Sequence, residues 1–347
     1  MAQVYKNFNL DQDVITGDVQ TISQPIWSEN MNPYSQSISG GIGFYTSSAQ
    51  ASQSGDYHIN VYHRDPATSV NAAIQFSIAY GNRLGSGSYG DPNTIGQNVN
   101  DTPSRAIYSQ YRNQLLPPTD NVFSFDGTDS DEVFVINLAR ARFRQKIDAG
   151  NWELRLGSGS TLGSATAFSS FIDTSGASDD YTLNEAGRVF LIKSGSGGVT
   201  ASNTTYGLFY PDQGVFVFHA GLMRSNLGWP INSASAASLV QARNHVTMSM
   251  ALKNASYFAA RSEEKVTSTH YFVRITNKEF NFSNNPTFVT GSSGRLRHSS
   301  MLRNPSVYIT SIGMYDPANR LVAVAKLSRP LLKSFNNEAL IKIKLDW

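Results

Sequence analysis

The chain of 347 residues contains no cysteine, which excludes disulfide scaffolds, thiolate zinc sites and cysteine nucleophiles together. Charged residues are also scarce, at 16% of the sequence against roughly 25% in typical soluble domains. A weakly charged surface gives little protection against association, so it is typical of proteins whose faces become covered by neighbours. The formal net charge of +2 argues against a dedicated nucleic-acid binder, because phosphate recognition needs a concentrated basic face.

Targeting segments are missing from the sequence too. No apolar run approaches the roughly 18 residues that a membrane-spanning helix needs. The first residues, MAQVYKNFNLDQD, lack the basic and then apolar pattern of a secretion signal. We therefore expect no membrane span, and folding in the cytoplasm of the cell that makes the protein.

Catalytic motifs are absent as well. The sequence has neither the G-x-S-x-G elbow of a serine hydrolase nor the H-E-x-x-H pair of a zinc protease. Gly85, Gly87 and Gly90 have the spacing of a dinucleotide-binding loop, but Asp91-Pro92-Asn93 follows where that motif needs a helix. This segment therefore predicts a surface loop. Gly195 to Gly198 lacks the lysine of a phosphate-binding loop and is interpreted in the same way.

Metal ligands are not grouped in the sequence. His58 and His63 stand five residues apart in a predicted strand, so their side chains leave opposite faces. The acidic stretch from Asp126 to Glu132 has oxygen ligands of the kind that calcium takes, but its Asp-Gly pair favours an ordinary turn. We predict that the protein is not an enzyme and has no cofactor and no metal site.

Strand-like patterns dominate what is present. Apolar alternation or short apolar runs predict a series of strands, which fall at residues 43–46, 57–63, 73–80, 132–138, 152–156, 188–193, 206–210, 215–220, 270–275, 307–315, 321–327 and 339–345. One helix is predicted over roughly 234–260, and the polar stretches 81–104, 157–205 and 281–305 predict loops. The expected fold class is mainly β: several antiparallel sandwich-like or barrel-like domains with long loops and one or two helices.

Four segments follow from this pattern. We expect an N-terminal arm at 1–36, a β-rich domain at 37–156, a loop-rich β unit or insertion at 157–233, and a helix with a C-terminal β domain at 234–347. The first segment sustains neither a helical nor a strand period, so we interpret it as an arm that becomes ordered against a partner.

Two groups of residues are candidates for partner contacts. The first group is the set of apolar residues in the arm, namely Tyr5, Phe8, Ile22 and Trp27. The second is Arg140, Arg142 and Arg144, which alternate along the chain and would form one basic stripe on an extended segment. A protein interface or a solvated face is favoured for this stripe over a phosphate or sugar-acid site. The aromatic residues 209–218 alternate or flank a turn, so they predict core and not a carbohydrate-binding face.

Several short segments of the sequence resemble segments of virion structural proteins from contractile-tailed bacteriophages, especially cyanophages. They are AYGNRLGSGS at 79–88, YSQYRNQLL at 108–116, INLARAR at 136–142, YGLFYPD at 206–212 and THYFVR at 269–274. The final pair, IGMYD at 312–316 and LVAVAKL at 321–327, is similar to a β-hairpin of phage baseplate and fibre-attachment proteins. The resemblance rests on these short sequence segments and includes no catalytic motif, so no functional residue can be carried over from it.

The resemblance implies a non-enzymatic building block of a phage tail, located at the baseplate or the fibre attachment point. It implies several symmetric copies, bound to other tail proteins. A second hypothesis is a receptor-recognition module that binds host-surface glycan through the loops at 157–205 and 281–305. A depolymerase with paired carboxylates is a third, and a neck or head-decoration position in the same particle also stays open.

Overall fold

A computed structural model of the chain describes residues 5–27, 45–46, 58–84, 104–158, 167–174, 181–229, 244–255, 257–283, 286–290 and 294–346. Strands make up 55% of the described residues and helices 17%, so the prediction of a mainly β fold is confirmed. The chain divides into two compact units. We call residues 22–264 the central unit, and residues 1–21 together with 265–347 the terminal unit.

This division differs from the four predicted segments. The predicted boundary at 156/157 falls at the end of strand β8 (Lys146–Gly157), and the boundary at 233/234 lies outside the described residues. The Ser, Gly and Thr content of 157–205 indicated loops, yet this stretch supplies strands to the same sheet as its neighbours. The actual division falls within two long strands, β1 (Val14–Pro25) and β14 (Phe258–Ile275), each of which has residues in both units.

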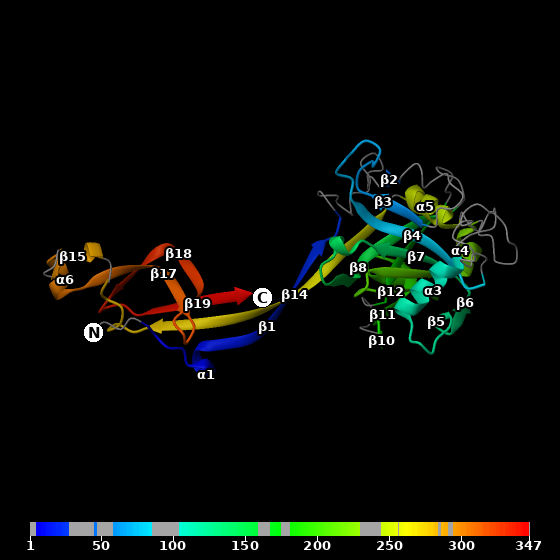
Figure 1. The fold of residues 1–347 in the computed structure, drawn as a ribbon. Helices are drawn as coiled ribbons and strands as arrows, with labels where there is room; N and C mark the ends of the chain where they lie inside the picture. The colour runs from blue at the N-terminus through cyan, green and yellow to red at the C-terminus, as the bar shows by residue number, and fades with distance from the viewer. Residues whose placement is uncertain are drawn as a thin grey trace. The chain divides into compact units, whose positions relative to one another are not determined.

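The central unit is built on one large antiparallel sheet, coloured from blue to yellow in Figure 1. Its further elements are β2 (Tyr45–Thr46), β3 (His58–Tyr62), β4 (Ile74–Asn82), α3 (Ser104–Leu115), β5 (Phe123–Phe125), β6 (Thr128–Ser130), β7 (Glu132–Leu138), η1 (Arg140–Arg142), β9 (Phe168–Asp173), β10 (Thr182–Asn184), β11 (Gly187–Ser196), β12 (Val199–Tyr210), β13 (Val215–His219), α4 (Ala220–Leu227) and α5 (Asn244–Ala255). The strand order is β14-β8-β9-β11-β12-β13-β7-β4-β3-β2, and β10 pairs with β11.

The middle of the sheet is buried on both faces, which explains the continuous apolar runs of β7 and β13. In β7, Phe134 and Ile136 point to one face while Val133 and Val135 point to the other. The register pairs Phe134 with Phe218 of β13, so large side chains lie beside one another on one face. Strands buried on both faces lose the alternation of polar and apolar residues, as the sequence indicated here.

One face of this sheet closes on itself. Phe258 in β14 and Phe76 in β4 belong to strands near opposite ends of the strand order, yet their ring centroids lie 5.5 Å apart. Trp152 in β8 contacts Phe216 in β13 at 4.7 Å. The sheet therefore curls around an aromatic core, in agreement with the expected barrel-like unit, and α4 and α5 add side chains to the same core. Helix α3 and the β5–β6 hairpin cover the other face.

The terminal unit has a much smaller core. Its elements are α1 (Leu10–Asp13), parts of β1 and β14, η3 (Pro286–Phe288), β15 (Val289–Thr290), β16 (Arg295–Leu296), α6 (Ser300–Arg303), β17 (Ser306–Tyr315), β18 (Leu321–Ser334) and β19 (Ala339–Asp346). Strand β14 pairs with β19, and the separate β17–β18 hairpin packs its inner side chains on them. The buried apolar members of this core, among the described residues, are Ile275, Ala339, Ile341 and Ile343.

Strand β18 is longer than predicted, since the sequence predicted an end at Leu327, before Pro330. Pro330 lacks an amide hydrogen and is tolerated only at strand edges and irregularities. The register supplies such a place: Ile309 pairs with Leu331, whereas Ser311 pairs with Lys326. Four residues of β18 thus bulge out of the ladder around the proline, and the strand continues beyond it.

Two further expectations differ from the structure. Residues 14–25 form strand β1, although the sequence showed no strand period there. Nearly every residue of β1 is exposed, and a strand without a buried face has no reason to alternate. Five α-helices occur in the described part where one or two were expected; α1 and α6 are single turns, too short to leave a periodic pattern. Helix α5 occupies the second half of the predicted 234–260 helix, and β14 starts at Phe258.

Candidate functional site

Two of the motifs that resembled binding loops are turns. Asp126 and Gly127 both have positive φ and form the two-residue turn of the β5–β6 hairpin. Gly197 and Gly198 do the same between β11 and β12. No group of three or more potential metal ligands occurs among the described residues. The candidate loop at Gly85, Gly87 and Gly90 lies outside them.

Two of the buried histidines that the structure describes, His219 and His270, have intramolecular contacts. His219 precedes α4 and its Nδ1 accepts from the Leu222 amide at 3.4 Å. Burial lowers the pKa of His219, which keeps the ring neutral and suited to this capping contact. His270 in the terminal unit lies 3.0 Å from the Asp18 carboxylate of β1. Both contacts join parts of the chain to one another.

The turn η1 interrupts the predicted basic stripe, although Arg140 and Arg144 stay exposed. Arg140 lies in the turn η1 and donates to the Asp212 carbonyl oxygen at 2.8 Å. Arg144 pairs with Glu264 at 3.2 Å, and Lys146 pairs with Glu263 at 2.8 Å. Arg142 is half-buried in the same turn. The turn breaks the alternation, and the strand β14 supplies carboxylates that neutralise the next two cations.

The apolar arm residues divide between two environments. Trp27 is buried in the central core, where its ring contacts Phe258 at 5.0 Å and its Nε1 donates to the Phe258 carbonyl at 2.8 Å. It is therefore not available to a partner. Ile22 is exposed on β1. Phe8 packs on Tyr271 at 5.4 Å, and Tyr5 is half exposed against Tyr315 at 5.4 Å.

The arm thus docks on its own chain. Within the terminal unit, Lys6 forms an ion pair with Glu279 at 2.8 Å, and Lys344 donates to Gln20 at 3.0 Å. The hydrogen bonds from Lys6 lower the pKa of the Glu279 carboxyl. The arm was predicted to become ordered against a partner, whereas in the structure its described residues contact their own chain. A single sequence does not show which surface an arm meets.

The strongest candidate for a partner contact is the outer side of the β17–β18 hairpin. Ile309, Ile312 and Met314 point inward to the terminal core. On the outer side, the paired positions 308/332 and 315/321 are both apolar, and Val324 lies opposite Gly313. We call this set the hairpin face, and its exposed large apolar members are Tyr308, Tyr315, Leu321, Val322, Val324 and Leu332.

The sequence contains a signal for this face. Apolar residues occupy both alternating positions of the two strands, as in Val307-Tyr308-Ile309 and Leu321-Val322-Ala323-Val324. Such a pattern predicts strands covered on both sides. In the structure one side is covered by the terminal core and the other is exposed. Tyr5, predicted as an interaction residue, contacts the hairpin face at Tyr315.

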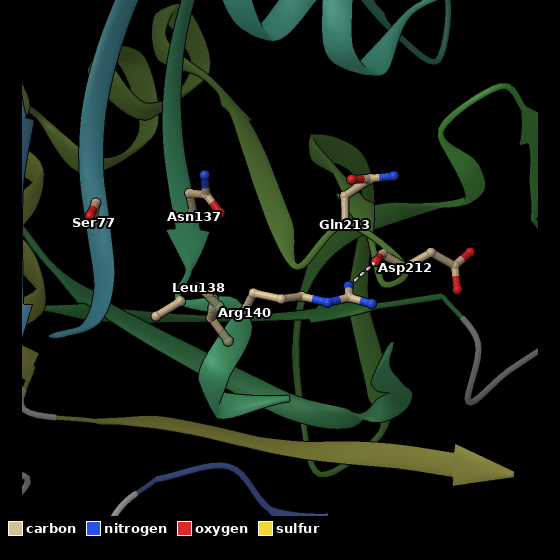
Figure 2. Close-up of a pocket in the computed structure, with 7 residues that line it drawn as sticks. Ser77, Asn137, Leu138, Arg140, Asp212 and Gln213 are labelled. Atoms are coloured by element: carbon tan, nitrogen blue, oxygen red, sulfur yellow. Dashed lines mark hydrogen bonds between the residues drawn. The ribbon is translucent and has the colours of Figure 1, made fainter. Parts of the chain in front are cut away.

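A second candidate site is a cavity of about 550 Å³ in the central unit, shown in Figure 2. Its lining residues come from β4, β7, η1 and the turn between β12 and β13, and they are Ser77, Asn137, Leu138, Ala139, Arg140, Asp212 and Gln213. Arg140 was predicted as an interaction residue, and the others were missed because they converge from distant parts of the sequence. The one local signal was Asn137, a polar residue within an otherwise apolar strand.

In the described part of the chain, no helix is long and apolar enough to cross a membrane. Comparison with family models, with curated proteins and with solved structures finds no match to this chain.

Proposed function

We propose that the protein is a non-enzymatic structural component that acts by assembly, with the hairpin face as its contact with further copies of the same chain. The observation that carries this proposal is the imbalance of the terminal unit. Among its described residues this unit buries four apolar side chains in its core, whereas the hairpin face alone exposes six large ones. Tyr315, Leu321, Val322 and Val324 lie together at one end of the hairpin, and exposed apolar clusters of this kind mark protein–protein contacts.

The free energy of burying the hairpin face also favours association. Full burial of a large apolar side chain gains about 1.5–3 kcal/mol relative to exposure. Six such side chains on one face are therefore a substantial driving force, from which the cost of association is subtracted. In addition, β17 and β18 pair only with each other among the described strands, so their outer edges keep backbone groups that another strand can meet.

The proposed setting is the tail of a contractile-tailed phage particle, at the baseplate or the fibre attachment point. Support comes from the phrases of the sequence given above, two of which, 312–316 and 321–327, form the hairpin that carries the exposed face. The scarcity of charge supports a protein whose surface is covered by neighbours. Other tail proteins are the further partners in this proposal, and a neck or head-decoration position is the alternative within the same particle.

Charge insertion into the hairpin face tests the proposal. In sedimentation velocity of the full chain, we expect the wild type to form a defined oligomer. The double variant Val324→Lys, Leu332→Lys is expected to sediment as a monomer, because a buried unpaired lysine costs several kcal/mol at an interface. The matched control is Val199→Lys, which places a lysine at an equally exposed position of the central unit and should leave the oligomer intact. A monomeric wild type, or an oligomer that survives the double variant, would contradict the proposal.

A further inference from the structure

Polar side chains line the cavity beside Arg140, although neighbouring positions on the same face of the sheet are apolar. Asn60, Ser77 and Asn137 are direct cross-strand neighbours on β3, β4 and β7. They form a polar row across a face that is otherwise packed with apolar side chains. A hydrogen bond of 2.7 Å joins Ser77 to Asn60, and Asn137 donates to the Tyr111 hydroxyl at 3.4 Å. The row therefore brings one hydroxyl, from Ser77, and one side-chain amide, from Asn137, to the cavity wall.

Arg140 is held in place at the edge of this cavity. Its Nη1 donates to the Asp212 carbonyl at 2.8 Å, and its guanidinium lies 4.8 Å from the centre of the Phe143 ring. Figure 2 shows the side chain running from the end of β7 towards Asp212, with the amides of Asn137 and Gln213 on one side of it. A guanidinium has five N–H donors, and this contact with Asp212 uses one of the two Nη groups. The others remain for an acceptor in the cavity.

The position of Arg140 favours an anionic ligand. The Asp212 carboxylate, the second charged group of the lining, points away from Arg140 in Figure 2 and accepts from the Arg188 backbone amide at 3.1 Å. Arg140 is the cation among the lining residues, which also supply one hydroxyl and two side-chain amides. Guanidinium groups bind carboxylates with good geometry, and hydroxyl and amide side chains bind the hydroxyl groups of sugars. The volume lies within the range of roughly 300–1,000 Å³ that small-molecule sites occupy.

We propose that this cavity binds a small polyhydroxylated carboxylate of the uronic-acid type, with Arg140 on the carboxylate and with Asn137, Ser77 and Gln213 on the hydroxyl groups. The site lies wholly within the central unit. The assembly proposal rests on the terminal unit, so failure of one proposal leaves the other unaffected.

Ligand-observed NMR titration of the full-length protein tests this proposal, with glucuronate as the probe. We expect millimolar binding, with glucose and propionate each about tenfold weaker, because glucose lacks the carboxylate and propionate lacks the hydroxyl groups. Arg140→Ala should weaken glucuronate binding at least about tenfold, and Arg140→Lys should give an intermediate loss because lysine keeps the charge but not the fork of donors. Arg144→Ala is the control, since Arg144 stands in the same segment and is largely exposed.

Thermal melting establishes that each variant is folded before it is titrated. Absence of glucuronate binding by the wild type would overturn the proposal, as would equal binding by the wild type and Arg140→Ala. Competition by an aspartate-containing tripeptide as strong as that by glucuronate would also overturn it, in favour of a protein side chain as the occupant.

Discussion

Replacing Trp27 with alanine is expected to lower the free energy of unfolding of the central unit by about 3–5 kcal/mol, the usual cost of removing a large aromatic side chain from a core. Trp27 lies against Phe76 and Phe258 at 5.8 and 5.0 Å. Its truncation leaves a cavity between the two strands that close the curled sheet, and it leaves the Phe258 carbonyl without the indole donor. The effect is large because this residue belongs to the core and not to a partner contact.

Guanidinium unfolding followed by fluorescence measures this effect, because Trp152 and Trp229 are buried in the same core and report on it. The matched control is Ile22→Ala, from the same segment of the chain. Ile22 is exposed, so its loss should change the free energy of unfolding by less than about 0.5 kcal/mol. A Trp27→Ala variant as stable as the control would return this residue to the role of a partner contact.

Gly214→Ala is expected to cost about 2–5 kcal/mol of the free energy of unfolding, from two sources. Gly214 has a φ of +72°, a conformation that alanine adopts at a cost. A Cβ at this position would also meet the Phe143 ring, with the ring atom Cζ only 2.3 Å away. The ring is buried and supports Arg140, so we expect the substitution to disturb the cavity of the central unit as well.

The variant Gly198→Ala separates the cost of the left-handed backbone conformation from the cost of the clash with Phe143. Gly198 has a φ of +80° in the β11–β12 turn, and a Cβ there meets nothing within 4 Å. Its substitution should cost about 1–2 kcal/mol, the penalty of the left-handed conformation alone. The difference between the two variants in chemical denaturation is the packing cost at Phe143. Equal losses for both variants would show that Phe143 is not packed against Gly214.

The strands of the central unit could be predicted from the sequence, since burial imposes its own pattern. β7 and β13 are continuous apolar runs because both their faces are covered. Strand β1 could not be predicted in this way. Its residues are exposed, and its conformation depends on pairing with β14, more than 230 residues away in the sequence.

Partner residues were harder to predict than strands. Trp27 and Tyr5 have the same apolar character in the sequence, yet one lies in the core and the other beside the hairpin face. Arg144 and Arg140 likewise alternate in the sequence, but β14 provides a carboxylate for Arg144 alone. Such differences depend on contacts between distant segments, and the hydrophobic periodicity of a sequence carries no information about those contacts.

The most direct test of assembly through the hairpin face uses the absence of cysteine, because a single introduced cysteine is then a unique label. Val324→Cys and Val199→Cys place a thiol at two exposed positions, 63% and 71% exposed in the isolated chain. The rate of maleimide labelling is measured at concentrations above and below assembly. If the hairpin face is the contact, the thiol introduced at position 324 is protected in the assembled state, while the thiol at position 199 reacts at the same rate throughout. Equal and rapid labelling of both positions in the assembled state would contradict it.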